Sequence, residues 1–119
     1  MTMTAMEPVW LVSEGRVLAA AKLATSRSDR RRGLLGVTTV EEPLVLMPCS
    51  WVHTVGMKVA IDVAHVSADG LVLRVATLKP WRVGAQNRQS HMIVEAAAGS
   101  FERWNIRIGS PLEVRYVQS

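Results

Sequence analysis

The chain has 119 residues and a mass of 13.1 kDa, which suits one domain and leaves no room for a second. Its apolar fraction of 49% and charged fraction of 20% are typical of a folded globular protein, and no apolar run reaches the roughly 18 residues needed to cross a bilayer, so we expect no membrane partner. The formal net charge is +4, but residues 27–32 alone supply +3 of it, and none of the six aromatic residues lies there, which speaks against nucleic-acid binding.

The N-terminus and the cysteine content indicate the compartment. Residues 1–8 have neither the basic start nor the apolar core of a secretory signal. A single cysteine excludes an internal disulfide, so nothing demands an oxidising compartment. We expect one domain over residues 1–119, flexible at residues 1–8, in the cytoplasm. The sequence leaves its oligomeric state open.

The first apolar runs predict a hairpin. Val9 to Val12 and Arg16 to Ala21 flank Glu14-Gly15, and the glycine readily takes the positive φ that a tight turn needs.

A short helix is expected from Ser28 to Gly36. Ser28 can cap its N-terminus and Gly36 can end it in a left-handed conformation. Leu34 or Leu35 is expected to be buried, with the solvated side of the helix formed by Arg30, Arg31 and Arg32. The basic segment, Arg27 to Arg32, is interpreted as a solvated face, and any further role is left open.

A strand and a hairpin are expected in the middle of the chain, and the hairpin consists of the apolar runs Ile61 to Ser67 and Leu71 to Leu78. Leu44 to Met47 lies between two prolines and predicts an interior strand. Asp69-Gly70 is a strong hairpin signal, and a two-residue turn there pairs Val66 with Leu73, Ala64 with Val75, His65 with Arg74 and Asp62 with Thr77. Asp62 then shares the apolar face of Ala64 and Val66, whereas His65 lies on the polar rim.

The C-terminal part predicts a strand at His91 to Glu95, a short helix after a cap at Ser100, and a strand with Leu112, Val114 and Tyr116 facing inward. Strands dominate and no regular β-α-β alternation appears. The fold class is therefore mostly β (α+β), a compact antiparallel β-sandwich or barrel with two short helices.

A series of short motifs runs through the chain in a characteristic order. They are Pro48 to Met57, Ile61-Asp62-Val63, Asp69-Gly70, Leu78 to Arg82, Val94-Glu95, Ala98-Gly99 and Gly109. Together they resemble the Domain of Unknown Function 192 family over roughly residues 30 to 114. The resemblance implies a small, mostly β domain of bacteria and archaea, often exported, with no established reaction and hence no catalytic residue to carry over. Many relatives have a tryptophan at the position of His53 and a threonine at that of Met57.

Soft ligands lie at intervals of four residues. Cys49, His53 and Met57 carry a thiol, an imidazole and a thioether, the set that Cu(I) prefers, but Pro48 and Gly56 argue against one regular helix face. We expect no metal and no cofactor, and a buried Cys49 and Met57 are the simpler interpretation. Cys49 as a nucleophile with His53 as its base is a further alternative.

The leading hypothesis is a polar cleft. Each of its candidate residues ends an apolar run, where strands open into loops that hold ligands, and Trp51 and Trp81 are candidate walls. The candidates are His53, Asp62, Arg82 and Glu95.

The sequence thus favours a non-enzymatic binding or accessory module that takes a small polar ligand or a peptide near His53 and Asp62. A small hydrolase-like enzyme using these two residues as acid and base is the alternative. A structural ion pair between Asp62 and Arg82 would explain the same residues without any ligand.

Overall fold

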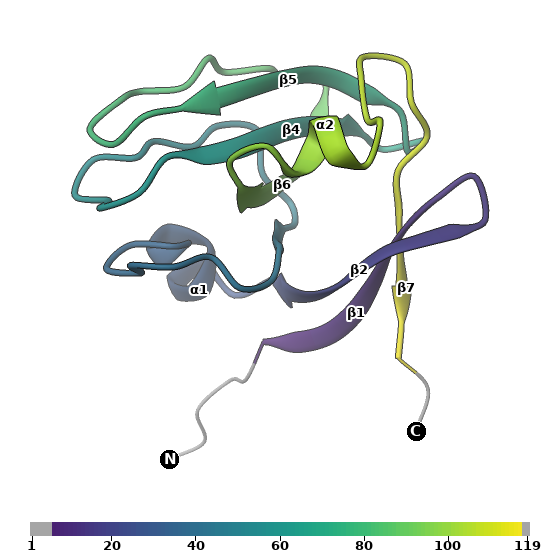
Figure 1. Ribbon diagram of the computed structural model, residues 1–119, viewed down its shortest axis with the longest axis horizontal. Helices are drawn as coiled ribbons and strands as arrows, with labels where there is room; N and C mark the ends of the chain where they lie inside the picture. Colours follow the sequence, from purple (N-terminus) through teal and green to yellow (C-terminus); the bar gives the residue numbers. More distant parts are fainter. Residues whose placement is uncertain (1–5, 118–119) are drawn as a thin grey trace.

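Seven strands and two short helices make up this computed structural model, which describes residues 6–117 (Figure 1). Their bounds are β1 (Glu7–Ser13), β2 (Arg16–Ala24), α1 (Arg27–Arg32), β3 (Leu44–Leu46), β4 (Ile61–Ser67), β5 (Val72–Leu78), β6 (Ser90–Ala97), α2 (Ser100–Arg103) and β7 (Glu113–Tyr116). The mostly β class with two short helices is confirmed. No helix in this part of the chain is both long and apolar enough to cross a membrane.

The strands form one sheet in the order β5-β4-β6-β3-β2-β1-β7. Every neighbouring pair is antiparallel except β2 with β3, which run parallel. A parallel pair needs a long crossover, and residues 25–43 with α1 supply one. This pair is the departure from an all-antiparallel arrangement.

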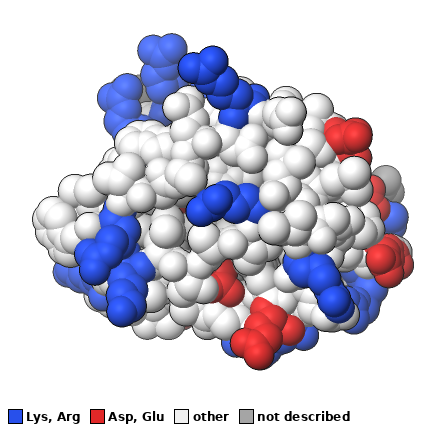
Figure 2. All heavy atoms as spheres, turned by 90° about the horizontal axis from the view of Figure 1, so that it is seen from above, with Lys and Arg blue, Asp and Glu red and all other residues white. Residues whose placement is uncertain are grey.

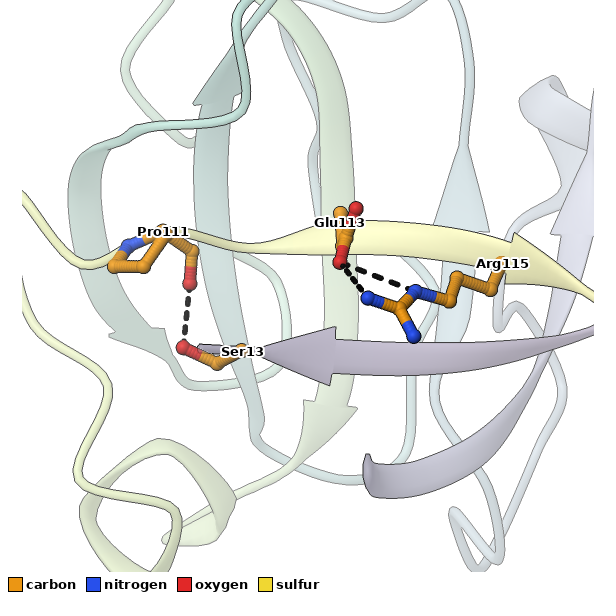
Figure 3. Close-up of polar contacts among 4 residues, drawn as sticks. All are labelled: Ser13, Pro111, Glu113 and Arg115. Carbon is orange, nitrogen blue, oxygen red and sulfur yellow. Dashed lines mark hydrogen bonds and ion pairs between the residues drawn. The ribbon is translucent and has the colours of Figure 1, made fainter. Parts of the chain in front are cut away.

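The sheet curls until its two edge strands meet at one corner. Leu71, just before β5, forms an isolated antiparallel bridge with Pro111, just before β7. The Val72 N–H donates to the Ser110 carbonyl at 2.9 Å, and the Ser13 hydroxyl donates to the Pro111 carbonyl at 2.6 Å (Figure 3). The curled sheet is therefore barrel-like rather than two separate layers.

The central strands β3, β4 and β6 are covered on both faces. One face of these strands, with Val45, Ala64 and Val94, lines the core enclosed by the curled sheet. The opposite face packs a second core beneath α1 and the loops. Its buried members are Ala24, Leu44, Leu46, Val52, Met57, Ile61, Val63 and Ile93. The uninterrupted burial of β3 explains why its residues form an apolar run without alternation.

The turns follow their glycines. Glu14 and Gly15 both have positive φ, 53° and 75°, as the predicted tight turn requires. At the second hairpin Gly70 has a φ of 85°, but its N–H donates to the Ser67 carbonyl and Val66 pairs with Val72. The turn is thus one residue longer than predicted, the three-residue type that ends in a left-handed glycine.

A bulge beside His65 corrects the register beyond this turn. The predicted pair of Val66 with Leu73 is wrong, yet Ala64 faces Val75 and Asp62 faces Thr77 as predicted. The longer turn and the bulge offset one another, because each shifts the pairing by one residue.

The basic helix begins and ends earlier than predicted. Ser26, not Ser28, is its cap, since the Asp29 N–H donates to the Ser26 hydroxyl at 3.1 Å. The helix ends at Gly33, whose φ is 50°, rather than at Gly36. Arg31 and Arg32 are exposed as expected and Arg30 is half-buried. Leu34 and Leu35 are half-buried rather than buried, because they cover the edge of the second core.

Other predictions need correction at the ends and edges of strands. Glu7 and Pro8 lie in β1, so the predicted flexible segment is too long at this end, and residues 1–5 lie outside the described residues. His65 is 3% exposed rather than on a polar rim, and burial, with Arg74 opposite, lowers the pKa of its imidazole. Tyr116 is 54% exposed because β7 is an edge strand paired only with β1.

The cap of α1 gives a test of this local structure. Replacing Ser26→Ala should lower the free energy of unfolding by about 1 kcal/mol, because the Asp29 N–H loses its acceptor. Ser28→Ala should change it by no more than a few tenths of a kcal/mol. Urea denaturation of both variants checks this, and equal losses would contradict the assigned cap.

Candidate functional site

Asp62 on β4 has a structural role in the core enclosed by the curled sheet. It is 4% exposed, and its Oδ1 accepts the Thr77 hydroxyl hydrogen at 2.7 Å. Its Oδ2 accepts from the backbone N–H groups of Gly99 and Phe101, at 3.0 and 3.2 Å. Gly99 is the N-cap position of α2 and has no side chain, so Asp62 caps this helix from a distant strand. The predicted cap, Ser100, is already the first residue of the helix.

Substitution of Asp62 should therefore destabilise the fold. Asp62→Asn keeps the size but turns one acceptor into an amide donor beside existing donors, so the free energy of unfolding should fall by about 2–3 kcal/mol. Chemical denaturation measures this, with the exposed Glu41→Gln as a control that should stay within about 0.5 kcal/mol of the parent. An Asp62→Asn variant that unfolds like the parent would overturn this assignment.

Glu95 on β6 lies on the opposite face of the sheet from Asp62. It pairs with Val63 of β4 and Leu44 of β3, both members of the second core. The side chain is 3% exposed, and its Oε1 is buried without any hydrogen-bond partner. Burial raises the pKa of this carboxyl to about 7.

Gly33 lies directly over this carboxyl. A Cβ at this position would sit 3.3 Å from Glu95 Oε1, which is a tight contact. The end of α1 thus approaches Glu95 more closely than a larger residue comfortably allows, and its positive φ also favours glycine.

A cavity of about 160 Å³ opens between α1 and the loop that follows β3. We call it the α1 cavity. Its lining combines one buried carboxyl with cationic, aromatic and apolar side chains. The lining residues are Arg30, Arg31, Arg32, Gly33, Leu34, Leu35, Leu46, Trp51, Val52, His53, Met57 and Glu95. The structure thus brings His53 and Glu95 of the predicted cleft together, and it excludes Asp62 from that site.

The arginines lie around Glu95 without neutralising it. Arg30 is held by the carbonyl of Pro48, to which its guanidinium donates at 2.8 Å. Within the described residues, the ion pair closer than 4 Å joins Arg115 and Glu113 of β7 (Figure 3), and neither of these residues lines this cavity. The α1 cavity therefore holds one unpaired carboxyl and three cationic side chains.

His53 is oriented by its neighbours. Its Nδ1 accepts the N–H of Val55 at 3.2 Å, which leaves the proton of the neutral ring on Nε2. The imidazole lies 5.5 Å from the Trp51 ring, centroid to centroid. His53 can therefore donate a hydrogen bond to a bound group.

Cys49 and Met57 fit packing roles. The Cys49 thiol donates to the Trp51 carbonyl at 3.3 Å rather than to His53, and burial raises its pKa. Met57 is buried in the second core. In residues 6–117 no three or more His, Cys, Asp or Glu side chains cluster as metal ligands would. The nucleophile pair of Cys49 and His53 is not formed.

Trp81 and Arg82 lie outside the α1 cavity. Trp81 is 65% exposed, and the Arg82 guanidinium donates to the carbonyls of Pro80 and Trp81 at 3.4 Å, not to Asp62. The suggested ion pair of Asp62 with Arg82 is therefore absent.

The sequence predicted the arginines of α1 to be solvated and did not assign them to a site, although they line the cavity. Gly33, which follows them, was the available signal, because a helix end that approaches another group closely favours a glycine.

The pH dependence of the free energy of unfolding should report the ionisation of the Glu95 carboxyl. Below pH 4.5 its carboxyl is protonated in both states; between pH 4.5 and about 7 only the unfolded state ionises, so the free energy of unfolding falls as pH rises. The loss amounts to about 3 kcal/mol and is complete above pH 7.

Denaturation of the parent and Glu95→Gln at pH 4, 6 and 8 measures this contribution as a difference. The free energy of unfolding of Glu95→Gln should rise relative to that of the parent as the pH increases, whereas that of Glu41→Gln should not. Parallel pH profiles for parent and Glu95→Gln would show that Glu95 ionises normally in the folded protein.

Comparisons with known proteins agree with this fold. The model of the DUF192 family, described as "Uncharacterized ACR", matches residues 9–114. A UPF0127 protein of Pyrococcus furiosus is 36% identical over 62 residues, which are 52% of this chain and 53% of that protein. The aligned part thus spans about half the length of that curated relative.

Two crystal structures share the fold. A protein of unknown function from Novosphingobium aromaticivorans superposes with a TM-score of 0.75 and 18% identity over 91% of this chain and 84% of its own. A "putative transcription regulator" from Sinorhizobium meliloti gives 0.77 and 19% over 96% and 97%. At these identities the likeness shows the fold alone. The family match covers most of the chain, which therefore belongs to the DUF192 family, whose function is not established.

Proposed function

We propose that this member of the DUF192 family is a non-enzymatic binding module that holds a small polar ligand in the α1 cavity. The observation that carries the proposal is the carboxyl of Glu95, which is buried, lacks a hydrogen-bond partner on Oε1, and lines the same cavity as His53 and three arginines. A buried polar group without a partner is costly, and a ligand that satisfies it recovers that cost.

The lining supports a ligand with two kinds of polar group. An ammonium or amide N–H would pair with Glu95 at the floor, and a carboxylate or phosphate oxygen would pair with Arg31 or Arg32. Trp51 and Leu34 offer apolar contact between these ends. The ligand class is therefore a small amphoteric molecule, or the polar end of a peptide.

The size of the cavity limits what enters it. About 160 Å³ corresponds to the liquid volume of roughly five water molecules. A group of a few heavy atoms fills it, and a larger ligand would extend past the exposed arginines into solvent.

A second candidate is acid–base catalysis in the same cavity. The pKa of Glu95, raised to about 7 by burial, suits a proton donor near neutral pH, and His53 is the second titratable group there. In this reading Glu95 replaces Asp62, which is engaged in capping α2.

Ligand-induced stabilisation tests the binding proposal. A thermal-shift screen of small amino acids, their amides and their phosphorylated forms should reveal a ligand that stabilises the parent by about 2.7 kcal/mol at 100 times its dissociation constant. The shift should disappear in Glu95→Gln and in Arg31→Ala with Arg32→Ala.

The shift should persist in the matched variants Glu41→Gln and Arg107→Ala, which lie outside the α1 cavity. A ligand that stabilises Glu95→Gln as strongly as the parent would contradict the proposal. Conversion of the ligand, lost in His53→Ala and Glu95→Gln, would favour the enzyme, and Cu(I) binding that requires Cys49 and His53 would favour the soft-metal alternative.

A further inference from the structure

The loop between β3 and β4 and the loop between β5 and β6 form a short antiparallel ribbon with an exposed apolar side. His53 and Val83 form a bridge, and the Gly84 N–H donates to the Val52 carbonyl at 3.1 Å. Val52 is buried on the inner side. We call the exposed side the Trp ribbon, and it consists of Trp51, Val55, Trp81 and Val83.

The Trp ribbon is strongly exposed, and the surrounding structure holds it in that position. Trp81 and Val83 are 65% and 67% exposed, and the pairing of the two loops groups them with the exposed Trp51 and Val55. Exposed apolar side chains that are grouped in this way mark an interaction surface. Trp81 also has a φ of 62°, a left-handed conformation that is costly for a bulky residue. Such strain persists only where the surrounding structure enforces it.

Thr54 is the residue that enforces it. Its buried hydroxyl donates to the Lys79 carbonyl at 2.6 Å and accepts the Arg82 N–H at 2.8 Å. Its own N–H donates to the Arg82 carbonyl at 2.7 Å, and its carbonyl accepts from the Trp81 N–H at 2.9 Å. The two loops are therefore joined rigidly, with the tryptophan displayed on their outer side.

The two stretches of chain that carry the Trp ribbon have charged residues of one sign. The sequence contains no Asp or Glu from residue 43 to 61 or from 70 to 94, whereas these stretches carry the exposed Lys58, Lys79, Arg82 and Arg88. In Figure 2 the end of the molecule that carries these loops shows Lys and Arg, and the Asp and Glu of that face lie nearer its centre and its other end. An anionic partner is indicated.

We propose that the Trp ribbon docks on the surface of an anionic lipid bilayer. The tryptophans and valines would enter the boundary between headgroups and acyl chains, while the lysines and arginines pair with lipid phosphates. The expectation of no membrane partner rested on the absence of a spanning segment, and surface docking needs none. This proposal is independent of the ligand in the α1 cavity.

A single-stranded nucleic acid fits this surface less well. Successive bases need flat aromatic faces to stack on, but the rings of Trp51 and His53 are tilted by 56° and the Trp51 Nε1 is engaged by the Gly84 carbonyl. Val55 and Val83 offer no stacking, whereas both suit an acyl boundary.

Vesicle co-sedimentation of the full chain tests the proposal. The parent should bind vesicles of phosphatidylcholine with an equal part of phosphatidylglycerol, and bind pure phosphatidylcholine much more weakly. Lys79→Ala with Arg82→Ala should weaken binding by about thirtyfold, because two charges near the anionic surface are lost. Trp81→Ala with Val83→Ser should weaken it at least tenfold on the mixed vesicles while leaving the melting temperature unchanged, because both side chains are exposed.

Matched variants on β7, Tyr116→Ser and Arg115→Ala, should bind as the parent does. Absence of binding to the mixed vesicles overturns the proposal, as does equal binding by the parent and the Trp81 and Val83 variant. Binding that a single-stranded oligonucleotide displaces, and that needs no phosphatidylglycerol, would also overturn it and would assign the surface to nucleic acid.

Discussion

The burial of β3, β4 and β6 on both faces is the constraint on which the rest of this structure depends. A strand with one face in solvent can leave a polar side chain in water, but these three strands have a core on each face. A polar group at a buried position of these strands must therefore find its partners inside the protein or remain without them. Asp62 and Glu95 are the two carboxyl groups on these strands, and the constraint gives them opposite roles.

The two carboxyls differ because alternation along a strand sends them to different faces. Asp62 faces the core enclosed by the curled sheet, where it accepts hydrogen bonds from the Gly99 and Phe101 N–H groups at the start of α2 and from the Thr77 hydroxyl. Glu95 faces the second core, where α1 passes over it with a glycine and offers no donor. One carboxyl completes the fold, and the other is buried with no hydrogen-bond partner on its Oε1.

The α1 cavity and the Trp ribbon are neighbouring features of one end of the molecule. Trp51 belongs to both, and His53, which lines the cavity, forms the bridge to Val83 of the Trp ribbon. Figure 1 shows α1 beside these loops, opposite the corner where β5 and β7 meet. If the protein docks through the Trp ribbon, the entrance of the α1 cavity would lie close to the surface to which the protein binds.

The local patterns of the sequence predicted the elements well. Turn glycines, apolar runs and alternation gave the hairpins, the interior strand at Leu44 to Leu46 and the mostly β class, because these features depend on neighbours a few residues apart. They also placed Asp62 on its apolar face, opposite Thr77. Where two local irregularities occurred together, as at the second hairpin, the register survived although the turn type did not.

The composition of the site was decided by tertiary structure alone. The parallel pairing of β2 with β3 brings α1 over Glu95, and no local pattern encodes that crossover. The cap of α2 comes from a residue 37 positions away, which removes Asp62 from any cleft with His53. The sequence by itself determined which side chains share a strand face, because that depends on the period of the backbone; which faces meet, and which buried carboxyl lacks a partner, was decided only when distant segments packed together.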